Sequence, residues 1–155
     1  MGSYRIPDEP LPGALSRLAV NPLWPLLGLM VGGPWAAWPW FLLNGHALGS
    51  PTRLREGLAL LLGFLGTVAL VSTILTLDRR GVFSTTTAQL ALLLVTLWKI
   101  AISYYLYLTQ SRSFGLYEYY GGPVRNGALV VIAVALAEPK LLAPVKNLFV
   151  LLVLG

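Results

Sequence analysis

The sequence predicts an all-α integral membrane protein, a bundle of about four transmembrane helices whose first and fourth spans are kinked. Of the 155 residues, 56% are apolar and only 11% are charged, and the mean hydropathy is +0.72. A soluble domain of this size could not cover so many apolar side chains with polar surface. The charges also lie in short clusters between long uncharged runs, which is the pattern that insertion into a bilayer requires.

The first predicted span covers residues 23–43, an apolar run just long enough to cross a bilayer at roughly 1.5 Å per residue. Pro34 would lie inside this helix, free the carbonyl of Met30 and kink the helix near its middle. Such kinks are tolerated in a bilayer. We expect residues 1–18 to form a polar N-terminal leader and residues 19–146 to form the four-span domain.

The second and third spans are predicted at residues 57–77 and 88–108. The second carries no charge, and Ser50 is expected to cap its helix, with a proline as the first helical residue. Ser84 and the threonines that follow it offer hydroxyl caps for the third span. The third span holds a single charge, Lys99.

The fourth span allows two interpretations. Residues 127–137 are too short to cross a bilayer before Glu138 and Pro139 interrupt them. Either a kinked helix continues to about Lys146 and leaves residues 147–155 as an apolar tail, or two half-length segments fold back as a re-entrant hairpin. The kinked helix is the favoured interpretation.

Small residues indicate where helices approach one another closely. Gly28 and Gly32 are four positions apart in the first span, and Gly63 and Thr67 share one face of the second. Small residues at this spacing let two backbones pack tightly in a membrane. We interpret them as packing within the chain rather than as a dedicated dimer motif.

The four-span topology places the aromatic ends of the first and third spans on one side of the membrane, as an interfacial belt. These aromatic residues are Trp35, Trp38, Trp40, Phe41, Tyr104, Tyr105 and Tyr107. The opposite side would carry Arg5, Arg17, Arg79, Arg80, Lys140 and Lys146, against Arg53, Arg55, Arg112 and Arg125 on the aromatic side. This small excess favours cytoplasmic termini, in a plasma membrane or a bacterial inner membrane.

Lys99 and Glu138 are predicted to lie at the same depth. Lys99 stands 13 positions before Arg112, and Glu138 stands 13 positions after Arg125, so antiparallel helices place both about 20 Å deep. An unpaired charge at the centre of a bilayer costs about 3 kcal/mol. We therefore expect a Lys99–Glu138 ion pair, either as a structural pair that fixes helix register or as a gate or ion relay. Alternatively, Glu138 lies near an interface and Lys99 snorkels or meets a partner subunit.

The loops at residues 44–56 and 110–126 are expected to lie side by side and to carry the candidate interaction residues. These are His46, Arg53, Arg55, Glu56, Arg112, Tyr117, Glu118, Tyr119, Tyr120 and Arg125. Such a set could bind an anionic lipid headgroup or a loop of a partner protein. The simpler interpretation is that arginine and tyrosine anchor the helix ends at the headgroups.

Several chemistries have little support. The net charge of +5 is spread without a basic run, which argues against nucleic-acid binding. The chain has no cysteine and one histidine, His46, so neither a cysteine nor a multi-histidine metal site can form, and no cofactor is expected. His46 could act as a general base with Ser50 as nucleophile and Glu56 as orienting group, but no nucleophile-elbow spacing surrounds that serine.

Three functional hypotheses follow from these observations. The first is a non-enzymatic accessory or interaction subunit, since titratable groups are scarce in the spans and the polar loops gather on one side. The second is a small homo-oligomeric transporter or channel that uses Lys99 and Glu138. The third, which ranks last, is a membrane-embedded lipid-modifying enzyme built on His46 and Ser50.

Overall fold

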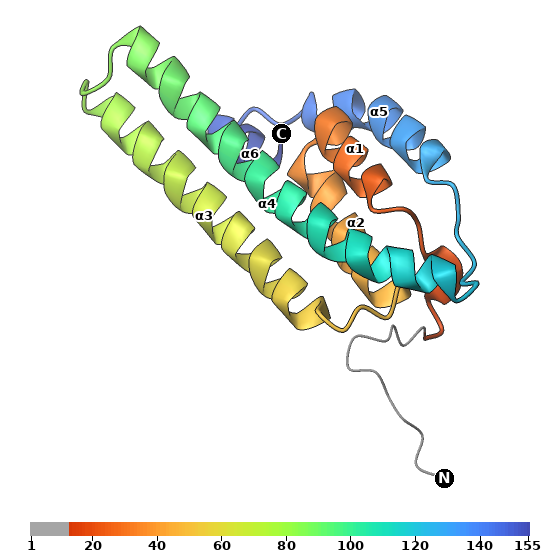
Figure 1. Ribbon diagram of the computed structural model, residues 1–155. Helices are drawn as coiled ribbons and strands as arrows, with labels where there is room; N and C mark the ends of the chain where they lie inside the picture. Colours follow the sequence, from red (N-terminus) through yellow and green to blue (C-terminus); the bar gives the residue numbers. More distant parts are fainter. Residues whose placement is uncertain (1–12) are drawn as a thin grey trace.

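The computed structural model describes residues 13–155, so most of the predicted leader at residues 1–18 lies outside the described part. The described chain is all-helical, as predicted, and contains no β-strand (Figure 1). Its elements are η1 (Ser16–Leu18), α1 (Leu23–Gly32), α2 (Pro34–Ala47), α3 (Arg53–Arg79), α4 (Thr85–Tyr119), α5 (Ala128–Leu142) and α6 (Leu148–Leu154).

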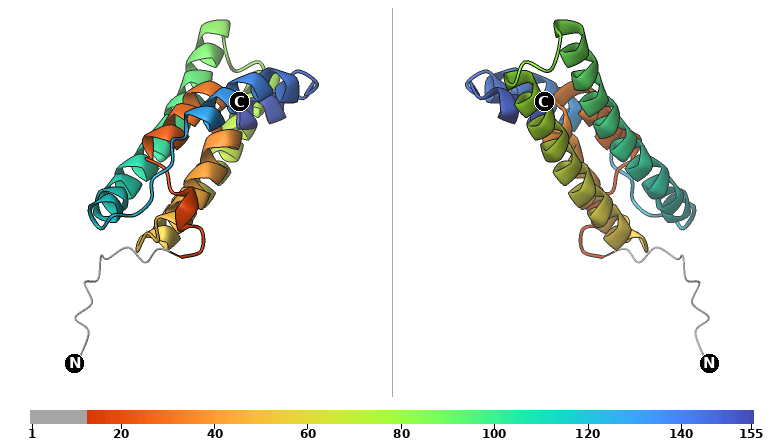
Figure 2. Two further views of the ribbon diagram at one scale, coloured as in Figure 1. Left: turned by 90° about the vertical axis from the view of Figure 1, so that its right-hand side faces the viewer. Right: turned by 90° about the vertical axis from the view of Figure 1, so that its left-hand side faces the viewer.

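Helices α3 and α4 form a long antiparallel hairpin along one face of the molecule (Figures 1 and 2). Among the described residues, these two helices are long and apolar enough to cross a membrane. Ser84 caps α4 as predicted, because its hydroxyl oxygen accepts the N–H of Thr87 at 3.3 Å. Ser50 does not cap α3: Thr52 holds the cap position, and the hydroxyl of Ser50 donates to Glu56 instead.

The first predicted span, residues 23–43, is corrected by the structure, because the chain turns back on itself instead of running through Pro34. α1 ends just before Gly33, whose φ of 78° is left-handed, and Pro34 opens α2. A left-handed residue cannot continue a right-handed helix, whereas proline suits the first position of a new one. The two helices lie antiparallel, with Gly28 of α1 against Trp40 of α2.

The favoured interpretation of the fourth span agrees with the structure in its helix past Glu138 and Pro139, and is corrected in its apolar tail at residues 147–155. α5 continues through Pro139, and the break comes only at the turn that contains Pro144. Asn147 then caps α6, because its side-chain oxygen accepts the N–H of Phe149 at 2.9 Å. α6 packs against α3 and folds back toward the α1–α2 turn. Residues 147–155 therefore belong to the bundle, and the alternative of two segments that fold back is closer to the structure.

The reversal between α1 and α2 brings the start of the described chain to the end of the bundle where α4 terminates (Figure 2). Three hydrogen bonds fix this arrangement: Val20 N–H to Asn44 Oδ1 at 3.0 Å, Arg125 N–H to the carbonyl of Ala19 at 2.8 Å, and the Tyr117 hydroxyl to the carbonyl of Ser16 at 3.0 Å. We call this the tyrosine end, which comprises residues 13–20, 44–56 and 110–126.

The positive charges do not favour one orientation in this arrangement. Arg17 lies at the tyrosine end, together with Arg53, Arg55, Arg112 and Arg125. The opposite end retains Arg79, Arg80, Lys140 and Lys146. The excess of positive charge that favoured cytoplasmic termini is therefore absent from the described residues.

The apolar core lies where the short helices meet the long hairpin. Phe41 of α2 and Leu106 of α4 are fully buried in its largest cluster, which also contains Trp38 and Leu60. A second cluster joins α3 and α4 to α6 through Val71, Ile74, Val95 and Val153. The short helices thus cover one face of the α3–α4 hairpin.

Candidate functional site

A buried carboxylate, Glu56, is the centre of the most extensive polar cluster in the described chain. It lies in the first turn of α3 and is 2% exposed. Its Oε1 atom accepts the hydroxyls of Ser50 at 2.5 Å and Thr52 at 2.8 Å, and its Oε2 atom accepts the Nε2 amide of Gln110 at 2.8 Å. Both oxygens of this carboxylate therefore have hydrogen-bond donors from the chain itself.

The same cluster extends into α2 and α4. Gln110 also donates to the carbonyl of Phe41 at 2.7 Å and accepts the Nδ2 amide of Asn44 at 3.0 Å. The hydroxyls of Ser50 and Ser113 lie 3.2 Å apart. We call Asn44, Ser50, Thr52, Glu56, Gln110 and Ser113 the Glu56 cluster. Its bonds join three helices at one level, and such a satisfied network specifies a single arrangement of the core.

A close backbone approach makes this cluster possible. A Cβ atom at Gly45 would collide with the carboxylate of Glu56 and crowd the amide of Gln110. Only glycine at this position of α2 lets the carboxylate reach the surface of that helix. The packing therefore depends on the contact between Gly45 and Glu56. No single sequence motif predicts this contact.

His46 does not join the Glu56 cluster. Its Nδ1 atom lies 2.9 Å from the carbonyl of Leu42, one turn earlier, and its side chain is exposed. Among the described residues, no hydrogen bond joins His46 to Ser50, whose hydroxyl is occupied by Glu56. The proposed constellation of base, nucleophile and orienting group is therefore not assembled in this structure.

Lys99 is the second buried charged group, and the backbone of α6 takes up its ammonium. Its Nζ atom donates to the carbonyls of Leu152 at 2.7 Å and Gly155 at 2.5 Å, and the residue is 7% exposed. The last carbonyls of a helix lack intrahelical partners and carry a partial negative charge. Lys99 therefore caps the carboxyl end of α6.

The expected Lys99–Glu138 ion pair is not formed between these two described residues. Both residues line one cavity of about 310 Å³, so they lie close together in the fold, as their equal predicted depth indicated. No feature of the sequence indicates that helix carbonyls also reach Lys99. Those carbonyls satisfy the ammonium, and Glu138 remains half-buried at the cavity wall.

Two chain reversals meet beside this cavity. Gly33, in the turn between α1 and α2, lies against the carbonyl of Leu154 and the backbone of Gly155, so that a Cβ atom would collide with them. Lys99 lies level with residues 63–66 of α3. Gly63 contacts Ile102 and Gly66 contacts Trp98, and these two residues of α4 lie on either side of Lys99 in the sequence. This level is about midway along α3, so two interrupted helical segments converge at half its length.

Tyr117, like Glu56, differs from the other predicted interaction residues, because it is buried and structural. It is 2% exposed, and its hydroxyl is within hydrogen-bond distance of the carbonyls of Ser16 at 3.0 Å and Pro123 at 3.2 Å. Tyr119 and Tyr120 are exposed, with their rings edge to face at 5.4 Å. The remaining exposed members of the predicted set are His46, Arg53, Arg55, Arg112, Glu118 and Arg125.

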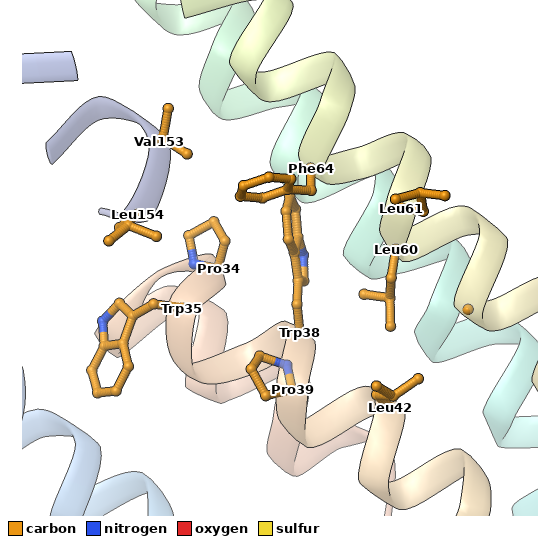
Figure 3. A pocket seen from close by; sticks show the side chains of 11 residues that line it. Pro34, Trp35, Trp38, Pro39, Leu42, Leu60, Leu61, Phe64, Val153 and Leu154 are labelled. Carbon is orange, nitrogen blue, oxygen red and sulfur yellow. The ribbon is translucent and has the colours of Figure 1, made fainter. Parts of the chain in front are cut away.

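Two further cavities open on the flanks of the bundle. One, of about 520 Å³, is lined by residues that include Arg55, Arg112, Thr52, Thr109 and Tyr105. The other, of about 560 Å³, lies between α2, α3 and α6 and is almost wholly apolar; Figure 3 shows Trp38, Phe64 and Leu60 along its wall.

The small residues predicted for helix packing all lie in contacts within the chain. Gly28 faces Trp40, and a Cβ atom at Gly32 would collide with Val134 of α5. Gly63 lies against Ile102 and Trp38, and the hydroxyl of Thr67 donates to the carbonyl of Gly63 at 2.8 Å. These four positions set the spacing of α1, α3 and their neighbours.

Sequence reasoning missed the polar stripe along α4, although its signal is present in the chain. Lys99, Ser103, Gln110, Ser113 and Tyr117 are all buried, and together with Leu106 they recur every three or four residues. This is the period of one helix face. Polar residues on one face of an apolar helix point into the bundle, where each finds a partner.

No protein family, curated protein or solved structure matches the chain. Among the described residues, no group of three or more histidine, cysteine or acidic side chains could hold a metal ion.

Proposed function

We propose that the protein is a multi-pass integral membrane protein that acts as a non-enzymatic interaction subunit and docks a partner protein at its tyrosine end. In this proposal, α3 and α4 cross the bilayer. The α1–α2 pair enters from the tyrosine end and turns back, and α6 enters from the opposite end. α1, α2 and α6 have 10, 14 and 7 residues. At roughly 1.5 Å per residue, each is too short for a hydrocarbon core of about 30 Å.

The proposal rests on one observation: both buried charged residues are hydrogen-bonded to other parts of the chain. Lys99 caps the end of α6, and Glu56 is held by three side-chain donors. Irregular backbone within a bilayer is tolerated where protein covers it, and Lys99 supplies that cover at Leu152 and Gly155. Because both charges are bonded to the chain itself, they support a structural role.

The exposed polar and aromatic groups gather instead at the tyrosine end. Tyr119 is 83% exposed and Tyr120 is 60% exposed. Arg53 and Arg125 are exposed at the same end. Tyrosine and arginine are enriched where proteins bind one another, because they combine a large contact area with hydrogen bonding.

Site-specific photo-crosslinking in the native membrane tests this proposal. A photoreactive residue at Tyr120 should yield one protein adduct, and native mass spectrometry after mild extraction should show that protein at a fixed stoichiometry. The matched control is Val82, which is 62% exposed at the opposite end and should yield no such adduct. A Tyr119→Ala, Tyr120→Ala variant should lose the partner. Equal adducts from both positions, or a chain that extracts without any second protein, would contradict the proposal.

A second candidate, a small homo-oligomeric transporter or channel, is favoured by the cavity beside Lys99, where interrupted helices meet at half the length of α3. Its test is ion flux in proteoliposomes. Glu138→Gln is the informative variant, because Glu138 lines the cavity without a side-chain hydrogen bond among the described residues, whereas Lys99→Met would also uncap α6. Slower flux in a folded Glu138→Gln protein would support transport, and equal flux would count against it.

A further inference from the structure

The outer face of the α3–α4 hairpin carries two arginines that have no partner within residues 13–155. Arg55 and Arg112 are exposed and line one wall each of the cavity of about 520 Å³, and neither makes a hydrogen bond or ion pair within the described chain. Thr52, Thr109 and Tyr105 line the same cavity. The hydroxyls of Thr52 and Thr109 donate to Glu56 and to the carbonyl of Tyr105, so the two guanidinium groups are donors that the chain leaves available to a ligand. The residues that line the cavity include no carboxylate.

An apolar groove continues along the same face. Arg112, Leu108, Tyr105, Ala101, Trp98 and Leu94 recur every three or four residues and form one stripe on α4. On α3, Thr52 and Arg55 share a face with Gly66 and Ala69 by the same spacing. The groove near Gly66 has a volume of about 570 Å³ and is lined by α3 and α4. The short helices pack on the other side of the hairpin.

The lengths and chemistry of the two parts match one lipid molecule. Trp98 lies 14 residues from Arg112, which is roughly 21 Å along the helix axis. Half of a bilayer, with its headgroup region included, is roughly 20–22 Å thick. A phosphate held by Arg112 would therefore sit at headgroup level while an acyl chain reaches the groove beside Trp98. Paired arginines are suited to the oxygens of a phosphate, which they bind bidentately.

We infer that this face binds an anionic glycerophospholipid, with its phosphate between Arg55 and Arg112 and one acyl chain in the groove at Gly66 and Trp98. The inference rests on the membrane location that is part of the proposed function, but it is independent of the protein partner. Each of the two arginines is expected to strengthen binding of an anionic lipid. Loss of both should therefore lower the affinity for that lipid by roughly tenfold to thirtyfold.

The headgroup contact is tested by native mass spectrometry of the full chain in nanodiscs that contain phosphatidylglycerol and phosphatidylcholine. Wild type should retain phosphatidylglycerol in preference to phosphatidylcholine, and Arg55→Gln with Arg112→Gln should lose that preference. Arg79→Gln with Arg80→Gln removes the same charge at the opposite end and should keep it. Equal loss in both double variants, or no loss in the first, would overturn the inference.

The acyl contact separates a lipid from a free anion. Ala101→Phe fills the groove from an exposed position and should weaken retention of long-chain phosphatidylglycerol, whereas Leu93→Phe, which is exposed outside the groove, should not. Inorganic phosphate at millimolar concentration should not displace the lipid. Displacement by phosphate, or identical retention in Ala101→Phe and wild type, would reduce the site to an anion-binding surface. Because these assays need no second protein, their outcome is independent of the partner-docking test.

Discussion

At the scale of single residues, the chain uses its few buried polar atoms to tie helices together. Glu56, Gln110 and Asn44 hold α2, α3 and α4 at one level, and Lys99 holds the end of α6. A buried donor or acceptor without a partner costs about 1–3 kcal/mol, so each of these bonds constrains the geometry more than its net energy indicates. The indole N–H of Trp35 is the exception among the described residues, because it is buried without an acceptor.

Two tryptophans of α2 provide a matched test of this principle. Trp38 donates its indole N–H to the hydroxyl of Ser103 at 3.0 Å, and Ser103 is fully buried. Trp38→Phe should destabilise the protein by about 1–2 kcal/mol, because it breaks that bond. Trp35→Phe removes a similar volume together with the unsatisfied donor, so it should lower the free energy of unfolding by less than Trp38→Phe does, or raise it. Thermal unfolding in one detergent measures both, and a larger loss in Trp35→Phe would contradict this account.

At the scale of elements, a single glycine decides whether the first apolar segment crosses or turns back. Gly33 combines a left-handed φ of 78° with a close contact to the end of α6. The sequence located the interruption, since Pro34 lies at the break, but proline alone predicts a kink. The reversal needs the preceding glycine and the partner that packs into its turn.

Gly33→Ala should therefore destabilise the bundle. A residue with a Cβ atom at φ 78° and ψ −172° is strained by about 1–3 kcal/mol, and the new Cβ would also collide with the carbonyl of Leu154. Gly115→Ala is the control, because it lies inside α4 with open space around it and should stabilise by up to about 1 kcal/mol. Unfolding temperatures measured side by side should move in opposite directions. An unchanged Gly33→Ala protein would show that the turn does not depend on this residue.

At the scale of the whole molecule, the reversal changes which segments would share a side of the bilayer in the proposed membrane arrangement. A single crossing by the first segment would place Leu15 on the side of Val82. The α1–α2 turn places Leu15 instead at the tyrosine end with Tyr120, because the hydroxyl of Tyr117 donates to the carbonyl of the neighbouring Ser16. The two topologies therefore differ in a property that can be measured without knowledge of function.

Cysteine labelling distinguishes these topologies, because the chain contains no cysteine of its own. Leu15→Cys, Val82→Cys and Tyr120→Cys replace residues that are 43%, 62% and 60% exposed. In sealed vesicles, an impermeant thiol reagent should label Leu15→Cys and Tyr120→Cys from the same side and Val82→Cys from the other. Labelling of Leu15→Cys together with Val82→Cys would restore the four-span topology.

The sequence by itself determined the helical class, the α3–α4 hairpin as far as residue 108, the Ser84 cap and the small residues at which helices approach. Residues 109–119 were expected in a loop, and the structure continues α4 through them. The features that the sequence determined follow from composition and local periodicity, which each segment expresses independently. The depth of Lys99 and Glu138 was also readable, because helical rise is constant. Only the tertiary structure decided the reversal at Gly33, the return of α6, the partners of Lys99 and the membership of the Glu56 cluster. Each of these features depends on contacts between segments that are far apart in the sequence. The hydropathy of a segment does not predict which other segment it will contact.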